Sequence, residues 1–414
     1  MPGPNSIELS PRVAIPQAFT QFVIKIQSRC NLNCTYCHVY NAQDNGWRRQ
    51  PMTMSESTMA VAGRRIAEHA ERFGLAAVGI VLHGGEPLIA GPHALNTYAS
   101  ILNREISPAS EVRLGVQTNG ILLSEEFLEV FDRWSIRVGV SLDGTPDAHD
   151  RRRRHHDGRG SHDAVIRAIR KLATAEYRHL FSGLLCVADV EADPMACYRE
   201  LAGLDPPAID FLLPHANWDR PPRGLGDRRR AIYADWLITV FDAWYEERRG
   251  APTVRLFEEV IGLLLAVPVR SESVGLSPST VVIIEANGDI EQVDSLKTAY
   301  DGASGTGLNV HSHSLERALW DPITMARQAG AQGLGQVCTA CPLRRVCGGG
   351  HFAHRYRTGH GFLNPSVYGA DLAKLIAHIG TRIYSDLRIK PPFLERGQVP
   401  ATWADGVRCT EWTP

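Results

Sequence analysis

The stretch Cys30-Asn31-Leu32-Asn33-Cys34-Thr35-Tyr36-Cys37 directly follows Phe22-Val23-Ile24-Lys25-Ile26, an apolar run typical of a buried strand. Three thiols at the spacing C-x3-C-x2-C can hold three irons of a cubane [4Fe–4S] cluster, which needs four ligands to be closed. No fourth cysteine lies nearby, so one iron stays open to a small molecule, as a three-ligand catalytic zinc keeps a position for water. The alternative is a structural zinc knuckle.

The composition is that of a soluble globular protein with room for two domains, or for one large barrel with an appendage: 414 residues, 44% hydrophobic and 21% charged. Lys and Arg total 44 against 45 Asp and Glu, so no basic field favours a nucleic-acid partner. The chain has no secretory signal and no apolar run of the ~18 residues that span a membrane, which predicts a cytoplasmic protein without a membrane partner. Nine cysteines, mostly at metal-ligand spacings, indicate cofactor ligation in a reducing cytosol.

From residue 20 onward, short apolar runs alternate with amphipathic segments. Most runs are continuously apolar, as parallel strands are when both faces of their sheet are buried. The expected strands are Phe22–Gln27, Val78–His83, Val112–Gln117, Arg137–Leu142, Gly183–Ala188 and Ile209–Pro214. The expected helices are Ser55–Phe73, with Ser55 as N-cap, His93–Glu105, Ser124–Trp134 and His162–Ala175. Six such units predict an α/β fold, an open partial (β/α)6 barrel with its chemistry at the carboxyl ends of the strands.

Polar residues follow three successive strands of this predicted barrel. They are Gly84-Gly85-Glu86-Pro87, then Thr118-Asn119, then Ser141-Leu142-Asp143. Glycines let the backbone approach a ligand closely, and the hydroxyl, amide and carboxylate groups can hydrogen-bond a ribose or an amino acid. Each segment taken alone also fits an ordinary turn. Their recurrence at consecutive strand ends after the cysteine loop favours a ligand site at the barrel mouth.

The chain divides into four expected regions. Residues 1–20 form an arm, 21–220 the partial barrel, 221–325 a helical bridge and a β-hairpin, and 326–414 a second thiol region. Within the bridge, residues 226–266 predict two helices, and Asn287-Gly288 predicts a type I′ hairpin turn between two short strands. The arm is too short to be a peptide-binding domain of its own.

A second group of thiols, Cys338-x2-Cys341-x5-Cys347, precedes Gly348-Gly349-Gly350-His351. Glycines beside the last thiol permit close backbone approach to an iron–sulfur cluster. A Cys3His zinc site that uses His351 fits the same spacing. The spacing alone leaves both readings open.

The first group of motifs resembles the radical S-adenosylmethionine (radical SAM) superfamily. The resemblance implies that Cys30, Cys34 and Cys37 hold a [4Fe–4S] cluster whose open iron chelates SAM, beside Tyr36. It assigns Gly84 to Pro87 to the turn that binds the SAM amino group. The spacing from Arg153 to Gly158-Arg159-Gly160-Ser161 resembles the R-x4-G-x-G-S segment of peptide-modifying members, which makes Arg153 the candidate partner of the SAM carboxylate. Without this resemblance, the charge run predicts a solvated loop for most of the arginines from 151 to 154.

The second group resembles the SPASM extension, where C-x2-C-x5-C-x3-C serves two auxiliary [4Fe–4S] clusters. This chain has His351 in place of the fourth cysteine and Val293 where that family has the cysteine before Asp294. The resemblance therefore implies one auxiliary cluster, held by Cys338, Cys341 and Cys347. Relatives carry a cysteine at the position of Gly369, so the fourth ligand is open between Cys409, His351, water and a substrate atom.

Gly348–Phe352 and Asn364–Tyr368 most resemble FxsB-type radical SAM/SPASM proteins, which modify peptides. This implies reductive cleavage of SAM to a 5′-deoxyadenosyl radical and a C–C (cyclophane) cross-link between an aromatic side chain and a Cβ of a ribosomal precursor peptide. Asp294 matches a base of sulfatase-maturing relatives and is the candidate catalytic base.

Other readings stay open: thioether formation, epimerisation, Ser or Cys oxidation as in sulfatase maturation, or a non-catalytic zinc module. The implied partners are an external electron donor of the flavodoxin or ferredoxin type and, if the peptide has a leader, a separate leader-binding protein.

Overall fold

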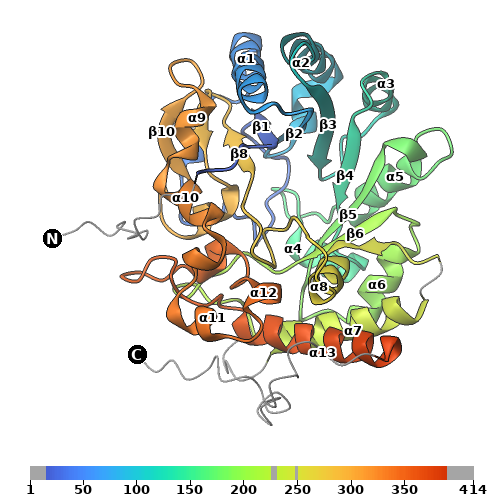
Figure 1. Ribbon diagram of the computed structural model, residues 1–414. Helices are drawn as coiled ribbons and strands as arrows, with labels where there is room; N and C mark the ends of the chain where they lie inside the picture. The colour runs from blue at the N-terminus through green and yellow to red at the C-terminus, as the bar shows by residue number, and fades with distance from the viewer. Residues whose placement is uncertain (1–14, 225–230, 248–249, 389–414) are drawn as a thin grey trace.

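The computed structural model describes residues 15–224, 231–247 and 250–388 (Figure 1). All six expected strands are confirmed. They are β1 (Gln21–Gln27), β2 (Ala77–Gly84), β3 (Glu111–Thr118), β4 (Arg137–Ser141), β5 (Phe181–Val187) and β6 (Ala208–Leu212). Each pairs in parallel with the next, so their carboxyl ends meet at one end of the sheet. In β1, the neighbours Ile24 and Lys25 point to opposite faces of the sheet and are both buried, which fits a strand covered on both faces.

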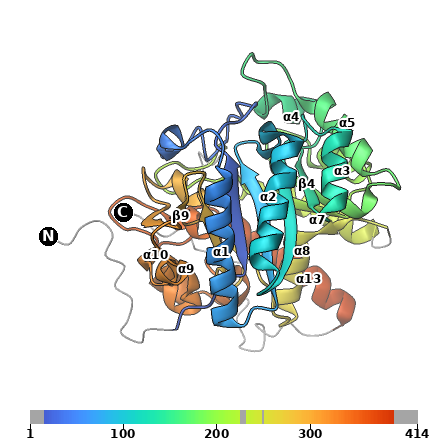
Figure 2. The ribbon, with the colours of Figure 1, turned by 90° about the horizontal axis from the view of Figure 1, so that it is seen from above.

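The expected helices are also present, between the strands. They are α1 (Glu56–Phe73), α2 (Gly91–Ile106), α3 (Glu125–Arg133) and α5 (His162–Leu172). Ser55 caps α1 as predicted, since its Oγ accepts a hydrogen bond from the Thr58 amide at 3.1 Å. Helices α1, α2 and α3 lie side by side along the outer face of the sheet (Figures 1 and 2). They leave the inner face free to surround a cavity.

Within the barrel, two helices were not predicted, α4 (Pro146–Arg152) and α6 (Pro194–Ala202). Each begins with proline after a capping residue, Thr145 or Asp193, a signal that the sequence did carry. The expectation of a solvated arginine loop is wrong for Arg152, which ends α4 and is paired with Asp189 at 3.0 Å.

The sheet extends beyond the six units on both sides. Its order is β10-β9-β8-β1-β2-β3-β4-β5-β6-β7. The added strands are β7 (Thr253–Val254), β8 (Val281–Ile284), β9 (Asp289–Glu291) and β10 (Gly305–Asn309). The expected hairpin is β8–β9, and β8 pairs in parallel with β1, so the hairpin belongs to the same sheet as the barrel.

The hairpin turn differs from the predicted type I′. That turn needs a positive φ at both Asn287 and Gly288, whereas Gly288 has φ +89° and Asn287 is not among the described residues with positive φ. The amide of Gly288 donates to the carbonyl of Glu285 at 2.8 Å, and the amide of Glu285 donates to the carbonyl of Asp289 at 2.9 Å. This is a three-residue loop whose last residue is a left-handed glycine.

The first and sixth strands line one cavity of about 640 Å³, together with residues of the C-terminal region. Gln21 of β1 and Phe211 of β6 both line it. In a flat sheet these strands would lie about 24 Å apart, at ~4.8 Å per strand, so the shared cavity means that the sheet curves into the expected partial barrel.

The two helices expected in residues 226–266 are α7 (Ile232–Glu247) and α8 (Arg255–Leu264). The C-terminal region adds α9 (Leu315–Leu319), α10 (Pro322–Gln328), α11 (Gln336–Ala340), α12 (Arg344–Cys347) and α13 (Gly369–Leu387). Helix α13 runs alongside α7 at the bottom of Figure 1. Within the described residues, no helix is long and apolar enough to span a bilayer.

Candidate active site

The cysteine loop that follows β1 is fixed by backbone hydrogen bonds to the segment after α4. The amide of Asn33 donates to the carbonyl of Arg154 at 2.8 Å, and the amide of Thr35 donates to that of Arg152 at 2.9 Å. Inside the loop, the Cys37 amide donates to the Cys34 carbonyl at 3.0 Å. The loop that carries Cys30, Cys34 and Cys37 therefore has a defined shape, and the arginine-rich segment is its support.

Glycines 84 and 85 let the end of β2 pass very close to this loop. Gly84 has φ +151°, and a Cβ there would lie 2.0 Å from the carbonyl oxygen of Gln27. A Cβ at Gly85 would lie 2.0 Å from the Tyr40 hydroxyl and 2.5 Å from the Arg29 carbonyl oxygen. Any side chain at either position would collide with backbone, which explains why the turn requires glycine.

Glu86 links the ends of β2 and β3, and Pro87 begins the short 3₁₀ helix η2 (Pro87–Ala90) after it. The buried carboxylate of Glu86 accepts hydrogen bonds from the Thr118 hydroxyl and the Asn119 amide, both at 2.7 Å. The Asn119 side-chain amide donates to Asn31 Oδ1, inside the cysteine loop, at 2.7 Å. Burial raises the pKa of Glu86, and the hydrogen bonds oppose that rise.

Tyr36, Asp143 and Arg153 meet on the other side of the loop. The Tyr36 hydroxyl donates to Asp143 Oδ2 at 2.5 Å, and a guanidinium nitrogen of Arg153 donates to the Tyr36 oxygen at 2.8 Å. Burial opposes the charge on Arg153, but Tyr36, Cys34 and Asp143 outweigh it and raise the pKa of the guanidinium. Ser141, at the end of β4, accepts from Gln117 Nε2 at 3.0 Å.

Arg153 also has an unused donor. Its Nε is buried and has no hydrogen-bond partner among the described residues. A buried donor without an acceptor destabilises the folded protein. This N–H is therefore suited to bind an acceptor from a ligand, such as the carboxylate of a bound amino acid. Three thiols, a close-passing glycine turn and a spare guanidinium donor together fit a [4Fe–4S] cluster with SAM bound beside it.

Neither set of thiols has the geometry of a zinc site. Thiolates around tetrahedral zinc, each ~2.3 Å from it, are about 3.8 Å apart. Among the described residues, the groups of potential ligands whose donor atoms all lie within 4.8 Å of one another consist of histidines or carboxylates. Both trios of cysteines are more widely spread, as suits a cubane in which each cysteine binds its own iron. Iron–sulfur clusters therefore fit both thiol sites better than zinc does.

The second set of thiols lines a small cavity together with Gly369. Cys338, Cys341 and Cys347 come from α11, the turn after it and the end of α12. Burial raises the pKa of the Cys347 thiol to about 12, so binding a metal there must displace a proton. Gly369, at the start of α13, lines the same cavity, and a Cβ on it would meet nothing closer than Pro365 Cβ at 3.9 Å.

Gly369→Cys is expected to supply a fourth thiolate to the auxiliary cluster. The SAM cluster also has an open iron and would give the same signal, so glycine and cysteine at position 369 are compared in a chain whose Cys30, Cys34 and Cys37 are replaced by alanine. With the wild-type glycine, the auxiliary cluster has three thiolates and should lose one iron on mild oxidation, giving a [3Fe–4S] signal by electron paramagnetic resonance. The variant should suppress that signal, because its fourth iron is held by protein. Ala373→Cys, which lines the same cavity one turn further along α13, is the matched control. An equal [3Fe–4S] signal with glycine and with cysteine at position 369 would contradict this ligand assignment.

Asp294 lies in a buried network of charges. It begins η4 (Asp294–Thr298), and its carboxylate binds Lys25 Nζ at 2.5 Å and Lys297 Nζ at 3.2 Å. The same two ammonium groups bind Glu285 at 2.9 and 2.8 Å. Burial opposes ionisation of Asp294, but Lys25 and Lys297 outweigh it and hold its pKa well below the usual range.

Two other carboxylates near Asp294 complete a potential metal-binding group, Glu285 and Glu291. The ammonium groups of Lys25 and Lys297 already bind all three carboxylates, because Lys297 also binds Glu291 at 3.0 Å. We therefore interpret this group as an ion network and not as a metal site. Lys25 was the sequence signal for it, a charged residue within an apolar strand.

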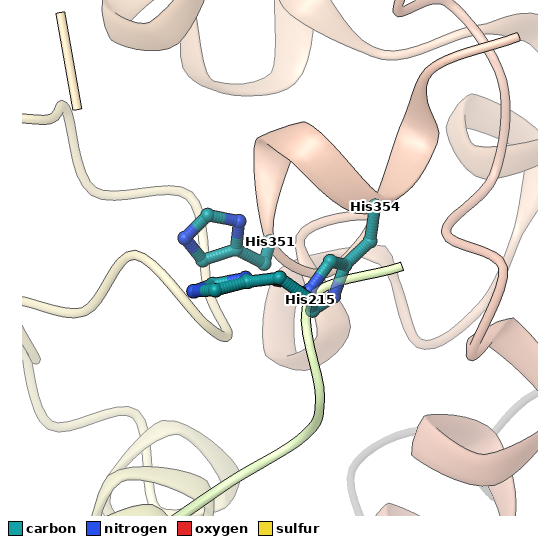
Figure 3. Close-up of side chains that lie close together, drawn as sticks. All are labelled: His215, His351 and His354. Carbon is teal, nitrogen blue, oxygen red and sulfur yellow. Dashed lines mark hydrogen bonds between the residues drawn. The ribbon is translucent and has the colours of Figure 1, made fainter. Parts of the chain in front are cut away.

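His351 is not placed with the thiols by any interaction that the structure shows. Its ring lies against His215 and His354, with ring centroids 5.2 and 4.9 Å apart (Figure 3). Sequence analysis did not single out His215 or His354, since isolated histidines in a loop and a short helix carry no pattern. Cys409, the other protein candidate for fourth ligand, lies outside the described residues.

Residues 24–193 match the profile of the Radical SAM superfamily. A serine-type anaerobic sulfatase-maturating enzyme of Klebsiella aerogenes is 24% identical over 380 residues, 88% of this chain and 87% of that protein. Another, of Bacteroides thetaiotaomicron, is 25% identical over 283 residues, 64% of this chain. The aligned part spans 66% of the Bacteroides protein, just under two thirds of its length.

Two solved structures share the fold. AnSMEcpe with bound AdoMet has a TM-score of 0.74 at 20% identity, covering 89% of this chain and 98% of that one. Streptococcus suis SuiB bound to precursor peptide SuiA has a TM-score of 0.57 at 15% identity, covering 84% and 75%. The fold and the site thus define a radical SAM domain at residues 24–193. The chain is similar in sequence to sulfatase-maturating enzymes, and its C-terminal region has the fold of a SPASM-like extension. The superfamily of the matched domain uses a [4Fe–4S] cluster and SAM.

Proposed function

We propose that this enzyme oxidises a side chain of a peptide or protein substrate by removing two hydrogen atoms from it. The observation that carries the proposal is the similarity to a sulfatase-maturating enzyme over 88% of the chain, supported by the contacts among the candidate SAM-binding residues. The same similarity favours oxidation of a Ser or Cys side chain as the particular reaction. The electron that starts each turnover comes from an external donor of the flavodoxin or ferredoxin type.

The bound cluster and SAM supply a 5′-deoxyadenosyl radical after one-electron reduction. The chain positions that chemistry: Cys30, Cys34 and Cys37 hold the cluster, and the close pass of Gly84 and Gly85 brings backbone groups to the SAM amino end. Arg153 Nε is the donor available for the SAM carboxylate. Glu86 does not need to bind the ligand directly, because its carboxylate holds Thr118 and Asn119 in place.

After hydrogen abstraction, the substrate radical must lose one electron and one proton to give a closed-shell product. Cys338, Cys341 and Cys347 would hold the auxiliary cluster, which would supply an acceptor for the electron. Asp294 is our candidate for accepting the proton. It is ionised, as a base must be, and it lies near Cys37 and His38, whose pKa values it influences. Its low pKa makes it a weak base, so the role depends on a substrate proton that is itself acidic.

A second candidate function is the C–C cross-link of a cyclophane in a ribosomal precursor peptide. It is favoured by the segments 348–352 and 364–368, which frame the auxiliary thiols. A Cβ on Gly350 would lie 3.0 Å from Ser366 Cβ, and the Trp218 indole donates to the Pro365 carbonyl at 2.7 Å. A leader-binding protein, where the peptide has a leader, would be a separate chain.

The two functions are separable by mass spectrometry, because both remove two hydrogens but only Ser or Cys oxidation leaves an aldehyde. Serine gives the aldehyde directly, whereas cysteine gives a thioaldehyde that water hydrolyses to the aldehyde with release of hydrogen sulfide. The enzyme should be coexpressed with the short open reading frame beside its gene and, separately, with a sulfatase-type Ser/Cys peptide. We expect the modified peptide to react with a hydrazide probe. A peptide that has lost two hydrogens, ignores the probe and resists backbone fragmentation between two residues would identify the cross-link instead. No mass change with either substrate, while SAM is cleaved, would contradict both.

A further inference from the structure

Three histidines converge at a point that the radical SAM chemistry does not use. His215 lies in the loop after β6, and His351 and His354 belong to η6 (Phe352–Arg355) and the residue that caps it. A 3₁₀ helix has three residues per turn, so residues three apart lie on the same side. His351 and His354 thus present their rings to the same point, where His215 meets them (Figure 3).

The nitrogen atoms already have the spacing of a metal site. One ligating atom from each ring lies within 4.8 Å of the other two. His215 Nδ1 and His354 Nε2 are 3.2 Å apart. Two nitrogens bound to tetrahedral zinc at ~2.0–2.1 Å are about 3.3–3.4 Å apart. A metal ion could therefore replace the hydrogen bond between these two rings with very little movement.

The surroundings suit a neutral imidazole site. The third ring, His351, has an Nδ1 that accepts only a long hydrogen bond, 3.3 Å from the Ala353 amide, so its lone pair is weakly engaged. The acidic group that acts on His351, Glu272, is paired with Arg327 and Ser279 and is not a free competitor for the rings. By contrast, the carboxylate group around Asp294 is filled by two ammonium groups.

The three histidines also face open space. All of them line the cavity of about 640 Å³, whose far end is lined by the starts of β1, β2 and β3. His215 and His351 are partly exposed, whereas His354 is only 4% exposed. A metal held by three imidazoles would keep one position directed at this cavity, and the SAM loops lie at the opposite ends of the same strands.

We propose that His215, His351 and His354 bind a divalent transition-metal ion, best fitted by Zn²⁺, with water or a carboxylate-type oxygen ligand in the open position. The site shares no ligand with either set of thiols, and it adjoins the first set, because the rings of His215 and His38, the residue after Cys37, have centroids 4.7 Å apart. It occupies the place where the sequence has His351 instead of the last cysteine of the C-x2-C-x5-C-x3-C pattern. With histidine in place of that cysteine, the chain would lose a ligand of an iron–sulfur cluster and gain a ligand of the proposed zinc site.

The test uses the full chain with its iron–sulfur clusters reconstituted anaerobically, so that the thiols are occupied by iron. Protein is equilibrated with one equivalent of Zn²⁺, desalted, and analysed for zinc, iron and sulfide. We expect about one zinc per chain. His215→Gln should weaken zinc binding on the order of 100-fold or more. Removing a residue that merely hydrogen-bonds to a metal ligand weakens binding by about 10- to 100-fold, and removing the ligand itself should cost at least as much. His93→Gln, an exposed histidine of α2, is the matched control and should bind zinc as wild type does.

X-ray absorption at the zinc edge provides a readout that does not depend on the variant folding. Wild-type protein should show only nitrogen and oxygen neighbours at ~2.0–2.1 Å. Sulfur at ~2.3 Å would place the zinc at the cysteines and overturn the proposal. So would a wild-type chain that retains no zinc, or a folded His215→Gln variant with unchanged iron and sulfide that binds zinc as tightly as wild type.

Discussion

Replacing Cys30, Cys34 and Cys37 together by alanine is expected to reduce 5′-deoxyadenosine formation to the detection limit. The three thiolates are the protein ligands of the cluster that passes an electron to SAM, and the rest of the SAM site cannot supply that electron. The measurement is 5′-deoxyadenosine released per chain from SAM and dithionite, with iron and sulfide counted on the same sample.

The matched control for this variant is the alanine substitution of Cys338, Cys341 and Cys347. It removes the same number of thiols from the other site. We expect it to cleave SAM at a rate of the same order as wild type but to form no modified peptide. If the first variant still released 5′-deoxyadenosine, the cluster would have to be bound elsewhere and the proposed function would fail.

Asp294→Asn is expected to destabilise the protein by about 3 kcal/mol, because it leaves a buried ammonium group partly uncompensated. Lys25 would keep only Glu285, and Lys297 would keep Glu285 and Glu291. The sign of the pH effect follows from the lowered pKa of Asp294. Its contribution is present above ~pH 3.9, the pKa of an unfolded aspartate, and is lost as the pH falls. Denaturant unfolding at neutral and acid pH measures both effects.

The double variant Lys25→Met/Asp294→Asn separates the structural role of Asp294 from its catalytic role. Removing one positive and one negative group leaves Lys297 paired with Glu285 and Glu291 and returns the network to its original net charge, so much of the lost stability should return. If Asp294 also accepts the substrate proton, both variants should still cleave SAM while forming no product. Full product formation by either variant would exclude Asp294 as the base, and an unchanged unfolding free energy in Asp294→Asn would exclude its part in the network.

The fold of residues 21–212 was predictable because the apolar runs of parallel strands are unambiguous when both faces are buried. The prediction missed β7, which has only two residues, and the pairing of β8 with β1, which joins positions about 260 residues apart. No local pattern specifies such a contact. The hairpin turn was also wrong, since Asn287-Gly288 fits both a two-residue turn and the end of a three-residue loop.

Within the site, the motifs predicted which residues belong to the site but not which contacts each of them makes. Glu86 is predicted to contact SAM, and the structure adds that its oxygens accept hydrogen bonds from Thr118, Asn119 and Leu88, contacts that the motif does not reveal. Asp143 is held by Tyr36 and by the Val187 amide, a contact from the next strand that no sequence spacing reveals. The histidine group was invisible for the same reason, because His215 lies 139 positions from His354.

The pairing of β8 with β1 has a consequence for how the chain must be built. β1 is the first strand made, but one of its edges has no neighbour until residues 281–284 are in place. A fragment that stops before these residues would expose the unpaired backbone amides and carbonyls of β1, in the strand that leads into the cysteine loop. Such an open edge favours aggregation by pairing with a strand of another molecule. The later part of the chain thus completes the sheet of the cluster-binding half, and we expect the two parts not to fold when they are expressed separately.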